Sequence, residues 1–184
     1  MLKGSKNSWG VIAKIFHWML AIFILVQITI GINLHFMETS PTKLGFINVH
    51  KLIGSTILLL VLARLIWRFY NTKPSNSNLS TLHRTISRII HTLLYILIII
   101  IPLNGMLYTW LSGYDVSILG IFNLPPLVDK DVAFAKQILP VHYNLTLLLI
   151  GIFTIHLLAA IYHRFIIHDK YDIWKRMSFN FKKN

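Results

Sequence analysis

Three histidines, His142, His156 and His163, lie in residues 141–165, a stretch that is otherwise apolar enough to cross a membrane. In an α-helix, 14 residues bring His142 and His156 back to within about 40° of the same direction and separate them by about 21 Å along the axis. One helix face therefore carries two imidazoles at different depths. Polar groups inside a membrane are rarely left without a partner, so this pair predicts a bound group.

Four apolar segments have the length that crosses a bilayer. The chain has 184 residues, of which 55% are hydrophobic and 13% charged, a composition that excludes an ordinary soluble domain. Each segment is close to the roughly 20 residues needed to cross a hydrocarbon core. We therefore expect an all-α integral membrane protein, a four-helix transmembrane bundle that forms one membrane domain over residues 1–184. The expected spans are about 15–34, 49–67, 89–110 and 141–165, with an outer loop at 111–140.

The basic residues are divided unequally between the two ends of these spans. If the N-terminus, residues 71–80 and the C-terminal tail share one side, that side carries 14 of the 18 Lys and Arg residues. The other side carries Lys43, Lys51, Lys130 and Lys136. Positive residues accumulate on the cytoplasmic side of membrane proteins, so we predict that both termini are cytoplasmic. The formal charge of +12 is then a signal of topology and not of nucleic-acid binding.

The outer loop at residues 111–140 contains two glycines and two prolines before a more regular stretch. We expect residues 129–139 to form a short surface helix. Pro140 then begins the fourth span, because proline is favoured at the first position of a helix.

Two further histidines match the depths of the pair on the fourth span. His17 lies one turn into the first span from the cytoplasmic side, and His50 opens the second span from the outer side. Depth therefore pairs His17 with His156 near the inner leaflet and His50 with His142 near the outer leaflet. Three helices thus offer two bis-imidazole sites. The alternative for any one histidine is a hydrogen-bonded residue of the bundle.

The residue types present limit what these sites can bind. With no cysteine, the chain can form no iron–sulfur cluster, thiolate metal site or covalent haem attachment of the C-x-x-C-H type. Zinc usually adds carboxylate or thiolate ligands, and no acidic residue lies within an expected span. Haem held by two axial imidazoles is the better fit. A histidine-lined metal transporter is the competing class.

Small and basic residues follow the same 14-residue spacing. It leads from His17 to Gly31 and from His50 to Arg64, and Gly54 lies one turn beyond His50. Glycines make room for a flat macrocycle, and an arginine at the inner depth can pair with a haem propionate. Close helix packing is the alternative explanation for the glycines, and anchoring at the membrane surface is the alternative for Arg64.

Several motifs resemble the bacterial, four-helix cytochrome b561 family over nearly the whole chain. They are the HW pair at His17, NVHKLIG at His50 followed by ARLIWR, the His91…Tyr95…Pro102…Gly105 pattern, and VHYNL…IHLLAAIYHR in the fourth span. The resemblance implies a bacterial inner-membrane protein with two haem b groups, held by His17 with His156 and by His50 with His142. Some members are similar to a superoxide oxidase, which passes electrons from superoxide to ubiquinone. Others resemble cytochrome b subunits of hydrogenases and related dehydrogenases.

Electron transfer is the chemistry that such sites support. Bis-imidazole iron has no open position, so it suits outer-sphere electron transfer better than oxygen binding. Together with this chemistry, the resemblance implies an oxidoreductase that oxidises periplasmic superoxide and reduces ubiquinone. The alternative is an electron-transfer subunit that anchors a partner dehydrogenase.

The remaining histidines and one lysine have secondary roles in this hypothesis. His163 lies about 10 Å nearer the cytoplasm than His156 on the same face and is the candidate quinone contact. His91 is expected to support the inner site, while His35, His83 and His168 have no assigned role. Lys51 adjoins His50 and is the candidate for attracting superoxide, a small anion.

Overall fold

The computed structural model describes residues 2–5, 8–74, 80–166 and 173–179. His168 and several residues used in the charge argument lie outside these ranges, namely Lys6, Lys170, Lys182 and Lys183.

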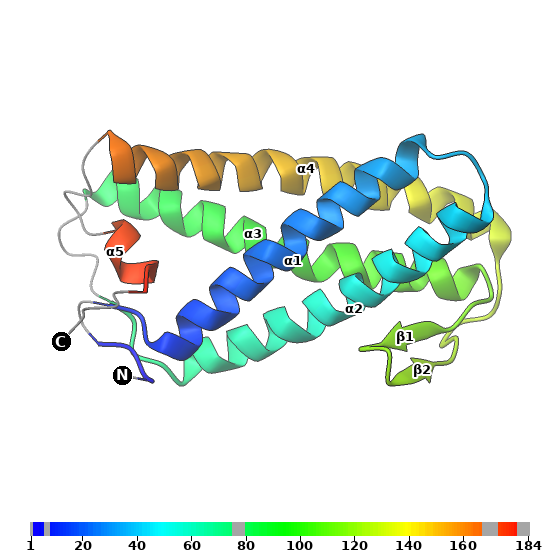
Figure 1. Cartoon of the computed structure of the whole chain (residues 1–184), viewed down its shortest axis with the longest axis horizontal. Helices are drawn as coiled ribbons and strands as arrows, with labels where there is room; N and C mark the ends of the chain where they lie inside the picture. Colours follow the sequence, from blue (N-terminus) through cyan, green and yellow to red (C-terminus); the bar gives the residue numbers. More distant parts are fainter. Residues whose placement is uncertain (1, 6–7, 75–79, 167–172, 180–184) are drawn as a thin grey trace.

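Four long helices run back and forth along the long axis of the molecule (Figure 1). They are α1 (Val11–Phe36), α2 (Pro41–Phe69), α3 (Thr81–Leu111) and α4 (Val132–Phe165). Each is long and apolar enough to cross a membrane. The expected four-helix membrane fold is therefore confirmed, while the direction in which the bundle crosses the membrane remains a prediction.

The helices extend beyond the expected spans because polar capping residues lie outside the apolar segments. Ser40 precedes Pro41, and its side chain accepts a hydrogen bond from the backbone N–H of Lys43. Ser80 caps α3 in the same way. Such caps satisfy backbone donors that the first turn of a helix leaves without a partner. As a result, α2 begins at Pro41 and not near residue 49.

The expectation of a separate surface helix at residues 129–139 is wrong. One continuous helix, α4, begins at Val132 and passes through Pro140. Proline removes one backbone hydrogen bond and crowds the preceding turn. Starting a second helix after Pro140 would require a new and costly nucleus, so continuation through a single missing hydrogen bond is favoured.

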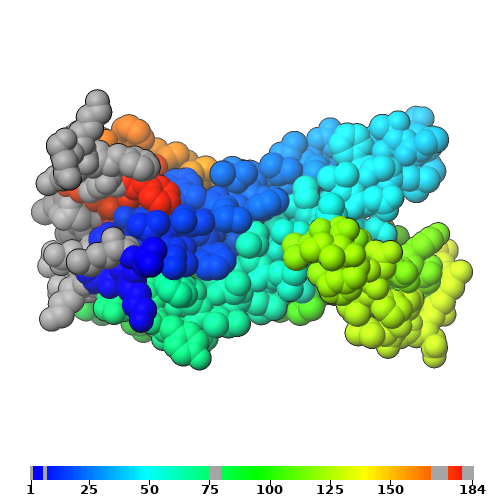
Figure 2. Space-filling view, turned by 60° about the horizontal axis from the view of Figure 1, so that its bottom comes forward, coloured from blue at the N-terminus to red at the C-terminus, as the bar shows by residue number. Residues whose placement is uncertain are grey.

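A short β-hairpin, which the sequence does not predict, precedes α4. Strand β1 (Val116–Ile118) pairs antiparallel with β2 (Phe122–Leu124), and Gly120 in the turn has a φ of +69°. The hydroxyl of Ser55 on α2 donates a hydrogen bond of 2.8 Å to the carbonyl oxygen of Ser117. The hairpin consequently lies against α2, and Figure 2 shows its segment as a lobe at the same end as the α1–α2 connection.

The core consists of two clusters that are joined in the middle of the bundle. One contains Leu20, Ile24, Ile57, Leu58 and Val61, from α1 and α2. The other contains Leu94, Leu97, Ile101, Leu149 and Ile152, from α3 and α4. Ile98 and Phe153 pack against both clusters, so they connect the two helix pairs. Many other apolar side chains of the helices face outward, as they do in a bundle that is surrounded by lipid.

At the opposite end from the hairpin, the short helix α5 (Ile173–Met177) lies beside the start of α1. The side chain of Lys14 donates a 2.7 Å hydrogen bond to the carbonyl oxygen of Ser178, and the indole of Trp18 donates to that of Met177. These contacts place the described ends of the chain together at one end of the bundle.

Candidate functional site

The structure brings His50 of α2 and His142 of α4 together near the hairpin end of the bundle. Their ring centroids lie 6.2 Å apart, with an angle of 72° between the ring planes. The Nδ1 atoms of both rings are buried and have no hydrogen-bond partner among the described residues. Because buried polar atoms are rarely left unpaired, this pair has the character of a site that binds a ligand.

Glycines on the two other long helices lie against this outer pair. A Cβ atom built on Gly31 of α1 would lie 3.4 Å from Cε1 of His50, and one on Gly105 of α3 would lie 3.2 Å from Cε1 of His142. A Cβ atom at position 105 would therefore press on the ring of His142, whereas one at position 31 would touch the ring of His50 at the edge of an ordinary contact. Gly31 lies at the outer depth, as its spacing from His17 predicts, whereas the 14-residue spacing does not point to Gly105.

Gly54 has a different neighbour. A Cβ atom at this position would lie 3.2 Å from Nε2 of Gln27. That nitrogen donates a 2.9 Å hydrogen bond to the carbonyl oxygen of His50. Gly54 thus lets a side chain of α1 reach the backbone of α2, which favours the close-packing explanation for this glycine.

The inner depth holds three imidazoles. His17 of α1 and His156 of α4 have ring centroids 6.2 Å apart, with an angle of 85° between their planes. The ring of His91 on α3 lies 5.3 Å from that of His156. Nδ1 of His91 is 2.6 Å from the carbonyl oxygen of Ser87, so this nitrogen donates to the backbone of its own helix.

These separations distinguish His17 from His91. A histidine nitrogen binds a metal ion at about 2 Å and the ring centre lies roughly 1 Å behind it, so two rings in line on one ion have centroids about 6 Å apart. The separation of 6.2 Å in both the inner and the outer pair matches this value. The 5.3 Å between His91 and His156 is too short for an ion between the rings and corresponds to a direct ring contact.

Arg64 lies on the inner part of α2, where its Nε donates a 2.8 Å hydrogen bond to the hydroxyl of Tyr95 on α3. Arg68, one turn further along α2, lies 3.5 Å from the same hydroxyl through a terminal guanidinium nitrogen. Both guanidinium groups also lie over the Tyr95 ring, at 5.8 and 5.5 Å from its centroid. Arg64 is close enough to His17 and His156 to act on them electrostatically.

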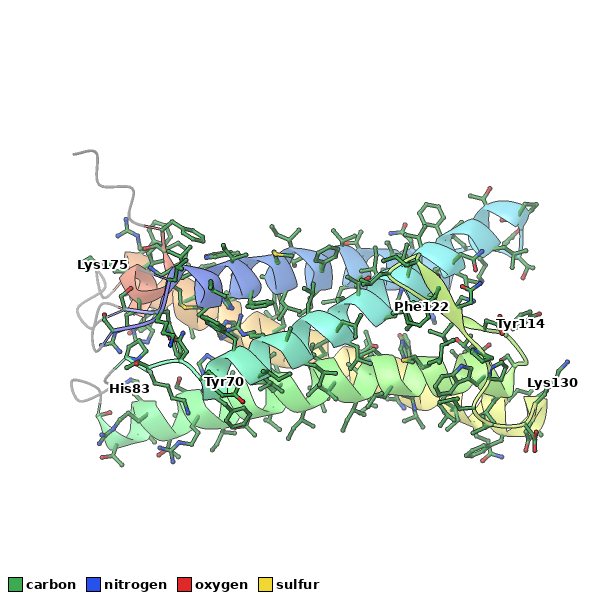
Figure 3. The ribbon with its side chains drawn as sticks, turned by 90° about the horizontal axis from the view of Figure 1, so that it is seen from below. Tyr70, His83, Tyr114, Phe122, Lys130 and Lys175 are labelled. Atoms are coloured by element: carbon green, nitrogen blue, oxygen red, sulfur yellow. The ribbon has the colours of Figure 1, made fainter. Side chains whose placement is uncertain are left out.

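The other histidines form contacts at the two ends of the bundle. The ring of His163 lies 6.5 Å from that of His83, near the inner ends of α4 and α3. His35 stacks on Tyr143 at 5.0 Å, at the outer end. The sequence did not predict either contact, because the two partners are far apart in the chain. Figure 3 shows the two ends, with His83 and Tyr70 at one and Tyr114 and Lys130 at the other.

A cavity of about 340 Å³ lies between the outer part of α2 and the hairpin, and neither His50 nor His142 is among its lining residues. Its lining includes Lys51, which follows His50 in the chain, together with Asn48, Asp115 and Asn123. The amino group of Lys51 lies 5.9 Å from the centroid of the Tyr114 ring. The sequence could not predict this cavity, because it depends on how the hairpin packs on α2.

The family model described as prokaryotic cytochrome b561 matches residues 8–179. The chain belongs to the prokaryotic cytochrome b561 family. It is also 29% identical over 178 residues to a protein named cytochrome b561 homolog 2 from Escherichia coli (strain K12), a match that covers 94% of this chain and 92% of the relative. As a member of this family, the protein is a multi-pass bacterial membrane protein that binds haem b and has an electron-transfer role.

The described residues of this cytochrome b561 fit the haem that the family binds. Two imidazole pairs have the separation that suits axial ligands of one iron, and the outer pair has buried nitrogen atoms without partners. Glycines border the outer rings. Within the described part of the chain, no three His, Asp or Glu side chains converge on a common point, so the arrangement suits paired axial ligands better than a three-ligand metal site.

Proposed function

We propose that this cytochrome b561 holds two haem b groups and carries electrons across the inner membrane from periplasmic superoxide to ubiquinone. His17 and His156 would hold the inner haem, and His50 and His142 the outer one. The observation that carries the proposal is the equal separation of 6.2 Å in the two histidine pairs. In this arrangement both chain termini lie on the cytoplasmic side, as the basic residues predict.

Bound haem supplies an iron that gains and loses one electron. The two imidazoles of each pair would hold the iron and leave it no open position, which would suit electron transfer and not oxygen binding. His142 and His156 are separated by about 21 Å along α4, so one rigid helix sets the spacing of the two sites. Arg64 is proposed to pair with a propionate at the inner site, because its electrostatic neighbours include the inner histidines.

At the outer surface, the cavity between α2 and the hairpin is the proposed place where superoxide collects. Lys51 supplies a positive charge within its lining, although Asp115 shares that lining. Attraction of a small anion would therefore be local to the lysine and not a property of the whole surface. No proton has to move for superoxide to lose an electron, so the outer residues need only guide the anion to the haem edge.

Quinone reduction requires two electrons and two protons, and the protons must come from the cytoplasmic side in this orientation. His163 lies at the inner end of α4 with its ring 6.5 Å from that of His83. Nδ1 of His83 is 2.7 Å from the hydroxyl of Ser80, which fixes the orientation of this ring. We assign His163 to the quinone carbonyl, with His83 as a neighbouring group that can resupply its proton.

The test uses the purified protein alone in detergent. Superoxide added from a stock solution should reduce the haems in a stopped-flow instrument, and a soluble ubiquinone analogue should reoxidise them. Superoxide dismutase should abolish the reduction and serves as the control. If the haems respond only after a partner dehydrogenase is added, the protein is an electron-transfer subunit and the proposed activity is wrong.

A further inference from the structure

Two arginines at the inner end of α2 share one neutral partner. Arg64 and Arg68 are four residues apart, so they lie on the same helix face about 6 Å apart along the axis. Both reach the hydroxyl of Tyr95 and both lie over its ring. The guanidinium carbon of Arg68 also lies 5.8 Å from the centroid of the ring of Trp9, a residue just before α1.

This arrangement leaves two positive charges without a negative partner in the described part of the chain. None of the six Asp and Glu residues lies in α1, α2, α3 or α4. Each guanidinium has five N–H donors, whereas the phenol oxygen they share can accept only one or two hydrogen bonds. Half-buried cations in a membrane bundle are costly unless they are paired, so the geometry calls for a group with two negative charges.

We propose that Arg64, Arg68 and Tyr95 form a clamp for both propionates of the inner haem, and that this clamp makes the inner haem the more easily reduced of the two. The inference rests on the proposed function, because it needs a haem between His17 and His156. Haem carries two carboxylates on one edge, which matches two guanidinium groups one helical turn apart in both number and charge. Arginine forks bind carboxylates in the bidentate manner that fixes such a group.

Tyr95 positions the clamp and does not react. Its hydroxyl accepts from Nε of Arg64 at 2.8 Å, which leaves both terminal nitrogens of that guanidinium to face a carboxylate. The ring lies beneath both cations and holds them by cation–π attraction. The clamp is thus preorganised before the haem arrives.

Among the described residues, the outer site has no equivalent clamp. All the arginines of the chain, Arg64, Arg68, Arg84, Arg88, Arg164 and Arg176, belong to the segments at the end of the inner pair. At the outer end, Lys51 follows His50 in the chain and shares its cavity with Asp115. Nearby positive charge favours the reduced haem, because reduction lowers the net charge by one. Electrons would therefore pass spontaneously from the outer haem to the inner haem, in the direction that quinone reduction at the inner side requires.

The test measures the midpoint potential of the inner haem alone, in a His142→Ala background that lacks the outer haem. We expect Arg68→Gln to lower the ratio of reduced to oxidised inner haem at a fixed ambient potential at least tenfold, which is about 59 mV for one electron. Tyr95→Phe keeps the ring and removes the hydroxyl, so it should shift the ratio in the same direction by less. Arg88→Gln, which removes an exposed arginine from the same side of the bundle, is the matched control and should cause no shift.

Three outcomes would overturn the proposal. Equal potentials for Arg68→Gln, Tyr95→Phe and Arg88→Gln would show that the clamp does not act on the haem. A shift seen in phosphatidylglycerol nanodiscs but not in phosphatidylcholine nanodiscs would assign the partner of the arginines to an anionic lipid headgroup. If the His142→Ala protein holds no haem although it folds as a helical bundle, the proposed function fails as well. Arg68→Lys keeps the charge but loses the fork, and an intermediate shift would support the clamp.

Discussion

Of the glycine-to-alanine substitutions near the outer histidine pair, Gly105→Ala should disturb the site most. The added Cβ atom would lie 3.2 Å from Cε1 and 3.4 Å from Nδ1 of His142, which is tighter than ordinary packing, so the ring would have to move. The same change at Gly31 places its Cβ 3.4 Å from Cε1 of His50, at the edge of an ordinary contact. Gly151, on α4 between the two haem depths, has nothing within 4 Å of a built Cβ atom and is the matched control.

The magnitude follows from two opposed effects. Replacing glycine by alanine inside a helix stabilises the helix by up to about 1 kcal/mol. Overpacking a close contact costs roughly 1–3 kcal/mol, and at Gly105 this cost falls on the orientation of His142. The stability of the bundle should therefore change little, while the affinity of the outer site for haem falls about 5–150-fold, the factor that 1–3 kcal/mol represents. The expected order of haem loss is Gly105→Ala first, then Gly31→Ala, with Gly151→Ala unchanged.

Haem release to an excess of an apo-haem acceptor protein gives this order directly. The Gly105→Ala protein should lose one haem per chain faster than the unmodified protein and keep the other at the normal rate. Circular dichroism of the same samples reports whether the helices are intact. If Gly105→Ala and Gly151→Ala release haem at the same rate, the inference that Gly105 borders the outer haem site is refuted.

Three further substitutions test the remaining parts of the molecule. Lys51→Gln should slow haem reduction by superoxide and weaken the dependence of this rate on salt, without changing the haem content. Lys136→Gln, at an exposed outer position, is the control and should change neither the rate nor its salt dependence. Stopped-flow rates at several ionic strengths measure both quantities. Gln27→Leu removes the 2.9 Å hydrogen bond to the carbonyl oxygen of His50, so thermal unfolding should show a loss of about 1 kcal/mol in stability. An unchanged melting temperature would show that this hydrogen bond does not stabilise the bundle. His163→Gln should slow reoxidation by a ubiquinone analogue with both haems retained, while His35→Gln at the outer end should leave reoxidation unchanged; equal rates for the two variants would remove His163 from the quinone site.

The sequence was sufficient to predict features that depend on one helix at a time. Helical rise and rotation are local properties, so the 14-residue spacing predicted that His142 and His156 share a face at two depths. The apolar lengths predicted four membrane helices, which the structure confirms. Because His17 and His50 lie at opposite ends of their spans, depth also predicted that His17 lies near His156 and His50 near His142.

Features that depend on how helices rotate against one another could not be predicted in this way. The contact of His91 with His156, the contact of His83 with His163 and the position of Tyr95 beneath the two arginines each require a specific rotation of α3. The sequence of α3 alone does not show which of its sides faces α2 and which faces α4, although the structure packs it against both. Tertiary packing decides it instead.

The outer loop shows a second limit of the sequence. Its Gly and Pro residues indicated irregular structure, yet they did not reveal that residues 116–124 fold back as a hairpin onto Ser55. Pro140 was read as the start of a helix because proline is common there. The same residue is tolerated inside a helix when an interruption would cost more, and only the packing of Val132 to Leu139 shows which case applies.

The pairing of the four histidines is the central claim, and haem counting in double variants tests it most directly. Removing both members of one pair, as in His17→Ala with His156→Ala, should leave one haem per chain. Removing one member from each pair, as in His17→Ala with His50→Ala, should leave none. Two haems per unmodified chain with this pattern are what the 6.2 Å separations predict. One haem retained in the His17→Ala, His50→Ala protein, or none in the His17→Ala, His156→Ala protein, would contradict the account.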